Sequence, residues 1–226
     1  SPIVLICEHA SAFIPPRYDR LGLGEAEALS HIAWDIGAGQ VTRHLSRLLD
    51  APAFLATHSR LMVDLNRPPA VASSIAIRSE ATDIPGNCDL SEQERAERVR
   101  HLFDPFHDVI AAFLDERAAR GGATPRILSI HSFTRVFLGE RRPWDVGILF
   151  ERAQDWAGRI LAGLQQAVDL NVGAHVPYSI GPEWDYAVPV HGDARGIDAV
   201  LIEICNDLVS DDRGARAMAE RLARLV

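Results

Sequence analysis

Three short apolar runs constrain the fold of this chain more than any other feature. They span residues 3–9, 126–131 and 200–204, and all three are rich in Ile, Leu and Val. Such runs are typical of strands that are buried on both faces of a parallel sheet. Helical patterns separate them, so the sequence predicts an α/β fold with three layers, α/β/α, and a mostly parallel mixed sheet. We expect residues 1–226 to form a single domain.

The spacing of apolar residues predicts the remaining elements. Helices are expected at about residues 24–32, 36–49, 91–120, 154–168 and 211–225. Short strands are expected at 53–57, 61–65 and 146–150, and an extended segment at 173–178. The helix that begins at Ser91 has a predicted kink at Pro105 and a predicted buried stripe of Val99, Leu102, Phe106, Val109 and Phe113. Residues 66–90, rich in Pro, Ser, Ala and Thr, form a candidate active-site loop or lid.

Composition excludes several kinds of partner and location. The formal net charge of −8 argues against a generally basic nucleic-acid surface. No apolar run approaches the roughly 20 residues that span a bilayer, so no membrane partner is expected. The chain enters a strand directly after Ser1-Pro2, which predicts no signal peptide. Three cysteines without paired spacing fit a cytoplasmic protein.

All 23 basic residues are arginines. A chain without lysine cannot form a lysine Schiff base with a substrate or with pyridoxal phosphate, and it lacks the lysine of a P-loop. It also lacks the lysine of a Cys-Glu-Lys amidase. Arginine instead offers planar pairs of donors that suit carboxylates.

Two histidines come at the carboxyl ends of predicted strands. His9 follows the first apolar run, and His131 ends the second. In open α/β sheets these strand ends border the ligand crevice, so we expect both side chains in one site. A catalytic zinc site needs about three protein ligands and an open position for water. Asp35, Glu8 or another carboxylate would be the third ligand.

A carboxylate interrupts the third apolar run, where Glu203 lies between Ile202 and Ile204. Burying a carboxylate costs several kcal/mol unless the group is paired or has a function. Beside a metal site, a desolvated glutamate would have a raised pKa, which suits a general base. The alternative is a structural ion pair, for example with Arg195.

Several arginines are candidates for binding substrate carboxylates. Arg60, Arg67 and Arg195 each lie in or beside a predicted loop. Two prolines follow Arg67 and would stiffen its backbone, which favours a preorganised clamp. For other arginines, the sequence indicates no more than a solvated surface position; these are Arg78, Arg141 and Arg142.

A series of motifs occurs in order along nearly the whole chain. They are Cys7-Glu8-His9-Ala10-Ser11, His31-Ile32-Ala33-Trp34-Asp35, Ser59-Arg60, Asp64-Leu65-Asn66-Arg67-Pro68, Ser129-Ile130-His131-Ser132-Phe133-Thr134, Arg142-Pro143-Trp144-Asp145, Pro177-Tyr178-Ser179, His191-Gly192 with Arg195-Gly196, and Ile202-Glu203-Ile204 with Asn206-Asp207. Together they resemble the N-formylglutamate amidohydrolase family. One departure is visible, because Arg135 follows Thr134 where the family has proline. Arg135 is expected close to the metal, where it could alter the substrate pocket.

The resemblance implies a phosphorylase/hydrolase-like fold, similar to that of zinc-dependent exopeptidases. It implies a site for Zn²⁺ or another divalent ion, formed by His9, His131 and a carboxylate, for which we choose Asp35. By analogy with the exopeptidases it also implies a general base at Glu203. The expected substrate-binding residues are Arg60, Asn66, Arg67 and Arg195. The family's named reaction is the hydrolysis of N-formyl-L-glutamate to formate and L-glutamate, known from histidine degradation.

The sequence thus predicts a metal-dependent hydrolase of a small N-acyl amino acid, with N-formyl-L-glutamate as the first candidate. Three alternatives stay open. The same fold could act as a peptidase-like or cell-wall amidase on a larger substrate. The chain could also be a ligand-binding relative without turnover, or Cys7 beside His9 could serve as a thiol nucleophile.

Overall fold

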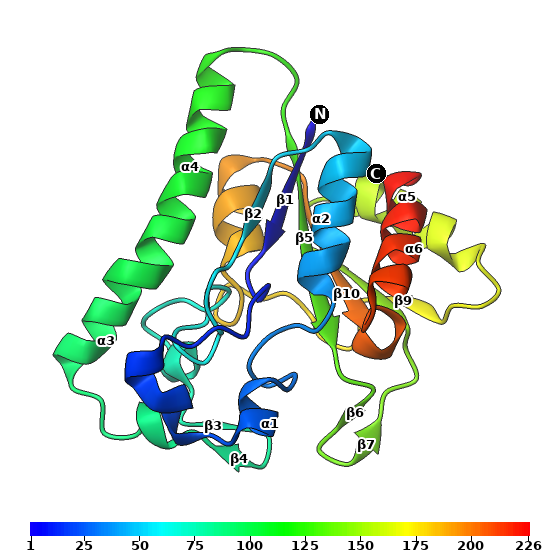
Figure 1. Ribbon diagram of the computed structural model, residues 1–226. Coiled ribbons are helices and arrows are strands. Elements are labelled where there is room, and N and C mark those ends of the chain that lie inside the picture. The colour runs from blue at the N-terminus through cyan, green and yellow to red at the C-terminus, as the bar shows by residue number, and fades with distance from the viewer.

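Six strands form the central sheet of this computed structural model, which describes residues 1–226 (Figure 1). Their order across the sheet is β2-β1-β5-β10-β8-β9. The strands are β1 (Ile3–Cys7), β2 (Ala53–Leu55), β5 (Arg126–Phe133), β8 (Val146–Phe150), β9 (Val172–Ala174) and β10 (Ala199–Cys205). Neighbouring strands are parallel except β10 and β8, which are antiparallel. The predicted mostly parallel mixed sheet is confirmed.

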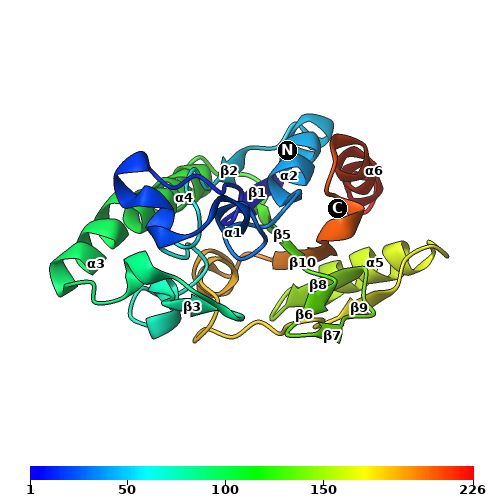
Figure 2. The ribbon, with the colours of Figure 1, turned by 60° about the horizontal axis from the view of Figure 1, so that its bottom comes forward.

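Helices cover both faces of this sheet (Figures 1 and 2). The helices of the chain are α1 (Glu25–Ala28), α2 (Ala38–Leu49), α3 (Glu92–Arg98), α4 (Asp104–Ala119), α5 (Gln154–Gln165) and α6 (Asp212–Ala223). On one face, apolar residues of α2, α5 and α6 share a core cluster with strand residues such as Leu5 and Ile202. On the other face, Ile110 and Leu114 of α4 pack with Val4. The three predicted layers are therefore present.

The connections gather at the carboxyl ends of the parallel strands. Two short hairpins lie there, β3 (Arg78–Ser79) with β4 (Thr82–Asp83) and β6 (Val136–Phe137) with β7 (Glu140–Arg141) (Figure 1). The first hairpin belongs to segment 66–90, which also contains two 3-10 turns, Ala72–Ile75 and Pro85–Asn87. No helix combines the length and the apolar character that crossing a membrane requires.

The predicted strand at residues 61–65 is wrong, because these residues form turns. All five are nevertheless buried, and four of them are apolar: Leu61, Met62, Val63 and Leu65. Side chains close the turns, since the Ser59 hydroxyl accepts a hydrogen bond from Leu61 N–H. A short buried apolar run has the same pattern in a strand and in a packed turn, so apolar pattern alone does not separate the two.

The predicted buried stripe of the long helix is confirmed only in part: Val99, Leu102, Phe106 and Phe113 are partly buried against the core, but Val109 is not. A π-helical turn, Val99–Phe103, separates α3 from α4 just before Pro105, close to the predicted kink. Such a turn inserts an extra residue and rotates the following helix. The fully buried residues of α4 are therefore His107, Ile110 and Leu114, whereas Val109 is 51% exposed.

Candidate functional site

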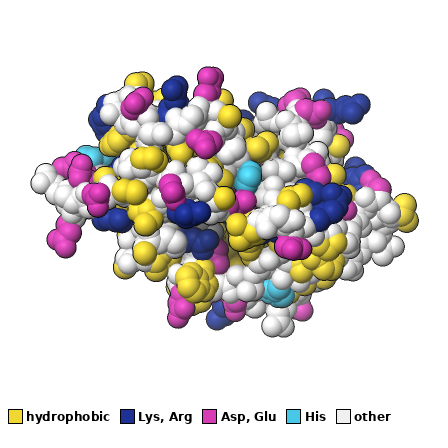
Figure 3. Space-filling model, turned by 90° about the horizontal axis from the view of Figure 1, so that it is seen from below, with side chains coloured by type: hydrophobic (Ala, Val, Ile, Leu, Met, Phe, Trp, Pro, Cys, Tyr) yellow, Lys and Arg dark blue, Asp and Glu magenta, His cyan; other side chains and the backbone are white.

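A cleft of about 680 Å³ opens at the carboxyl ends of the strands. His9 follows β1, His131 lies in β5 and Glu203 lies in β10, and all three line this cleft. Segment 66–90, the predicted lid, contributes lining residues that include Glu80. Figure 3 shows this face of the molecule, with a hollow near its centre and acidic, basic and histidine side chains around it. The strand topology thus brings the predicted residues to one place.

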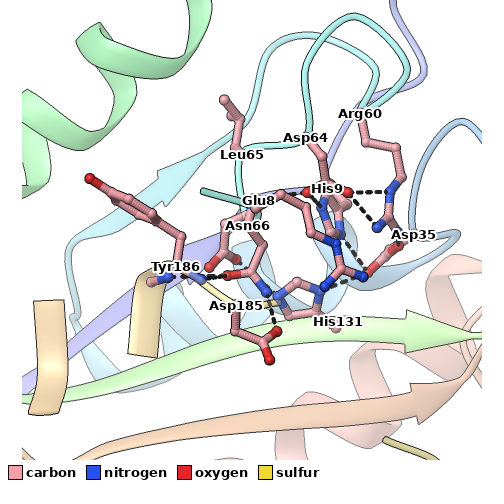
Figure 4. A network of polar contacts seen from close by, with 12 residues as sticks. Glu8, His9, Asp35, Arg60, Asp64, Leu65, Asn66, His131, Asp185 and Tyr186 are labelled. Carbon is pink, nitrogen blue, oxygen red and sulfur yellow. Dashed lines mark hydrogen bonds and ion pairs between the residues drawn. The ribbon is translucent and has the colours of Figure 1, made fainter. Parts of the chain in front are cut away.

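Three buried side chains converge at one point of the cleft wall (Figure 4). The Nδ1 atoms of His9 and His131 lie 3.3 Å and 3.0 Å from the same oxygen, Asp35 Oδ2. One ligand atom from each residue lies within 4.8 Å of the other two. This is the trio His9, Asp35 and His131 that the sequence reasoning selected.

A second carboxylate stands behind each of the two histidines. His9 Nε2 lies 2.7 Å from Asp64 Oδ1, and His131 Nε2 lies 3.1 Å from Glu8 Oε2. His9 Nε2–H can donate to Asp64, and His131 Nε2–H to Ser129 Oγ, which in turn donates to Glu8. In a neutral imidazole, which carries a single proton, this leaves the Nδ1 lone pair free to bind a metal ion at the shared point. Glu8 therefore lies on the side of His131 that faces away from the point where the three side chains converge. Sequence reasoning missed Asp64, although it interrupts the apolar residues Val63 and Leu65, the same signal that marked Glu203.

The buried charges depend on one another for stabilisation. Burial by itself would raise the pKa of Asp35 and Asp64, but His9 and Arg60 next to them hold these carboxyls below their ordinary pKa. Burial would likewise lower the pKa of His131, but Glu8 and Asp35 raise it well above the ordinary value. Opposite charges at hydrogen-bonding distance favour the ionised form of each partner.

The residues present fit a divalent metal ion. Two imidazole nitrogens and one carboxylate oxygen are a common ligand set of catalytic zinc, which keeps a further position open. The remote nitrogen of each imidazole meets a carboxylate, the arrangement that fixes the tautomer and orientation of metal-binding histidines. The cleft leaves one side of the trio accessible.

The backbone before α2 sets the position of Asp35. Its N–H donates to the carbonyl oxygen of His9 at 2.9 Å, so the two residues are held together by main chain as well as by side chains. Gly37 follows with a φ of +83°, and a Cβ at this position would overlap the carbonyl oxygen of Val209. Asp35 lies in the connection between α1 and α2, outside any helix.

Glu203 faces the cleft from the neighbouring strand. It pairs with His131 in the register of β10 and β5, and with Gly147 on β8. Its Oε2 is buried and has no hydrogen-bond partner, and burial raises the pKa of its carboxyl to about 7. Gly147 lets the backbone of Val176 pass directly over β8, because a Cβ there would overlap the Val176 carbonyl. The alternative ion pair between Glu203 and Arg195 is absent.

The predicted substrate residues have different surroundings. Arg60 lines the cleft, but its Nε and Nη2 donate to Asp64 and its Nη1 to Asp35. Arg67 lines the cleft and donates from Nη1 to the carbonyl oxygen of Trp184. Arg195 lies outside the cleft lining and pairs with Asp115 of α4 at 2.5 Å, so its predicted contact with substrate does not fit this structure.

Asn66 lines the cleft with an amide that is already engaged. Its Oδ1 accepts from the N–H groups of Tyr186 and Ala187, and its Nδ2 donates to Asp185 (Figure 4). Asn66 thus holds the segment around Asp185, itself a cleft residue that sequence reasoning missed.

Two further expectations need correction. Arg135 does not line the cleft; it bridges Asp145 at 2.6 Å and Asp207 at 2.8 Å, and so ties the loops after β5 and β10 together. Cys7 is fully buried, and burial beside Asp35 raises its thiol pKa well above the ordinary value. A thiol in this state is not a nucleophile, which argues against a thiol enzyme.

A buried histidine pair lies outside the cleft lining, and sequence reasoning did not find it. His191 belongs to a π-helical turn, Val188–Gly192, and its Nε2 lies 2.9 Å from His107 Nδ1 on α4. His107 Nε2 in turn lies 2.8 Å from the carbonyl oxygen of Leu65. The pair joins α4 to the two segments that hold Asn66 and Asp185.

Comparisons with known proteins agree with this fold. A family model described as N-formylglutamate amidohydrolase matches residues 1–210. The chain is 39% identical in sequence to a gene product from Agrobacterium tumefaciens. The crystal structure of that protein matches this fold with a TM-score of 0.94, over 99% of this chain and 88% of that chain. An N-formylglutamate amidohydrolase from Ralstonia eutropha is 15% identical, with a TM-score of 0.69 over 99% and 90% of the two chains, a likeness of fold. A search of curated proteins finds no match.

Proposed function

This chain belongs to the N-formylglutamate amidohydrolase family, and we propose that it is a metal-dependent hydrolase of the amide bond in small N-acyl amino acids. Membership supports hydrolysis of an amide bond, and N-formyl-L-glutamate is the substrate that names the family. The observation that carries the proposal is the convergence of His9, Asp35 and His131 beside Glu203, a buried carboxylate without a partner.

The metal site in this proposal consists of His9, Asp35 and His131. A divalent ion, with Zn²⁺ as the first choice, would polarise the scissile carbonyl and lower the pKa of a water molecule. Asp64 holds the His9 imidazole, and Ser129 with Glu8 the His131 imidazole, in the ligating tautomer through Nε2. Arg60 offsets the negative charge of Asp64 and Asp35.

Glu203 is the general base and then the general acid in this reaction. Its carboxylate would take a proton from the attacking water and deliver it to the leaving nitrogen. A pKa of about 7 suits both transfers, because a group of this pKa gains and loses a proton readily near neutral pH. The free Oε2 leaves the carboxylate available to the cleft.

Metal content and turnover test this function together. Protein purified without added metal should contain about one zinc per chain by plasma mass spectrometry, and His131→Ala should lose it. His31→Ala is the matched control, since His31 lines the cleft and pairs with Glu80 at 2.6 Å, outside the trio. Glu203→Gln should keep the metal and lower kcat on an N-formyl amino acid by about 100-fold or more.

Three results would contradict parts of the proposal. A chain that takes up no metal even after incubation with zinc would be a ligand-binding relative and not a hydrolase. Near-normal turnover in Glu203→Gln would remove Glu203 from the role of base. A metal-loaded protein that cleaves short peptides and no N-acyl amino acid would support the peptidase-like alternative.

A further inference from the structure

The cleft is large, and carboxylates outnumber guanidinium groups along its lining. Its volume of about 680 Å³ lies in the range of pockets that hold drug-sized ligands, which are much larger than N-formyl-glutamate. The lining includes five carboxylates and two guanidinium groups. The carboxylates are those of Asp35, Asp64, Glu80, Asp185 and Glu203. Arg60, Arg67 and a divalent ion would together balance about four of the five carboxylates, so the cleft has no excess of positive charge to attract a ligand with two negative charges.

Arg60, one of the two lining guanidinium groups, is not free to bind a substrate carboxylate. Its contacts with Asp64 and Asp35 involve Nε, Nη1 and Nη2, and its side chain is only 26% exposed. Moving it toward a substrate would leave two buried carboxylates without their counter-ion, which is costly. Arg67 is therefore the remaining arginine of the lining, and its guanidinium offers a position for one carboxylate.

Aromatic side chains form part of the cleft wall. The lining contains Phe133, Phe137, Tyr178 and Trp184. Two of them are unusually open for large aromatic residues, since Trp184 is 56% exposed and Tyr178 43% exposed. Exposed apolar side chains along a cleft mark a surface that binds an apolar partner group. Trp184 also holds Arg67, because its carbonyl oxygen accepts from Nη1.

Arg142 contacts two rings of this aromatic wall. The guanidinium of Arg142 lies 4.4 Å from the ring centroid of Phe137 and 4.8 Å from that of Tyr178. Such cation–π contacts hold both rings in place. Arg142 lies outside the cleft lining, so it acts on the ligand surface through these rings. A rigid aromatic wall loses little conformational entropy when a ligand packs on it.

We propose that the preferred substrate is an N-acyl amino acid with one carboxylate and an apolar, aromatic-sized side chain. Arg67 binds the carboxylate, and Trp184 and Tyr178 contact the side chain. This assignment rests on the amide hydrolysis proposed above and specifies its substrate class. N-formyl-glutamate, which carries two negative charges, is then a less favoured substrate.

A substrate pair with the same acyl group tests the assignment. With the zinc-loaded enzyme, kcat/KM for N-formyl-L-phenylalanine should exceed that for N-formyl-L-glutamate by about 10-fold or more. Arg67→Gln should lower kcat/KM for N-formyl-L-phenylalanine by roughly 10- to 100-fold and leave its carboxamide analogue within about 2-fold. Arg141→Gln, an exposed arginine outside the cleft lining, is the matched control and should change neither value.

Trp184→Ala separates the side-chain contact from the carboxylate contact. It should lower kcat/KM for N-formyl-L-phenylalanine about 10-fold and change that for N-formyl-L-alanine little, because alanine does not reach the wall. Faster hydrolysis of N-formyl-L-glutamate would overturn this inference and leave the proposed hydrolysis intact. If neither compound is hydrolysed, the proposed function fails. In that case, calorimetry can still compare the binding of the two compounds. Tighter binding of N-formyl-L-glutamate would overturn the assigned ligand class.

Discussion

Acid should destabilise this protein through the buried pair of His107 and His191. Burial lowers the pKa of both imidazoles, that of His191 to about 4. In the unfolded chain a histidine has a pKa of about 6.5. Between these two values the unfolded chain binds a proton at position 191 that the folded chain does not bind. The contribution of His191 to the free energy of unfolding is therefore fully present above about pH 6.5 and is lost as the pH drops toward 4.

The size of the effect follows from proton linkage. Each pH unit between the two pKa values changes the free energy of unfolding by about 1.4 kcal/mol per histidine. For His191 alone, the loss between about pH 7 and pH 4.5 is about 2 kcal/mol. His191→Gln removes this titration and keeps an N–H that can donate to His107 Nδ1, the contact that His191 Nε2 makes at 2.9 Å.

Urea unfolding at about pH 7 and pH 4.5 measures the difference. Wild type should lose about 2 kcal/mol more stability than His191→Gln over this interval, with metal removed from both samples. Subtraction cancels the shared contribution of the carboxylates and of His9 and His131. His101→Gln, at an exposed histidine, should retain the wild-type dependence. Equal losses in wild type and His191→Gln would refute the reasoning, because His191 would then titrate alike in both states.

Two more predictions concern the metal site and the loops around it. Asp35→Asn should reduce zinc affinity by more than about 100-fold and Glu8→Gln by roughly 10- to 100-fold, because Asp35 supplies a ligand atom and Glu8 only orients His131. Competition with a chelator gives both affinities, and a larger loss for Glu8→Gln would reverse the assignment. Arg135→Gln should lower the free energy of unfolding by about 2 kcal/mol, since it breaks hydrogen bonds to Asp145 and Asp207. Its KM should stay within about 2-fold of wild type, and a larger change would place Arg135 in the cleft after all.

The sequence alone determined the layers of the fold and the main elements of the site. Continuous apolar runs specify buried parallel strands, and polar residues at their carboxyl ends mark the crevice. This reasoning located His9, His131 and Glu203, because chain topology fixes where strand ends meet. It also found the long cleft-lining segment at residues 66–90, since its length and composition are unusual for a plain connection.

Only the tertiary structure decided which polar groups are free and which are paired. Arg60 and Arg195 look alike in sequence, but one neutralises Asp64 and Asp35 and the other pairs with Asp115 across the surface. Asp64, Asp185 and His107 have roles set by partners more than 50 residues away in the chain, as the contact between His9 and Asp64 shows. The π-helical turn before α4 likewise affected which residues of that helix are fully buried. Local pattern encodes burial and periodicity, whereas pairing depends on where the folded chain places distant side chains.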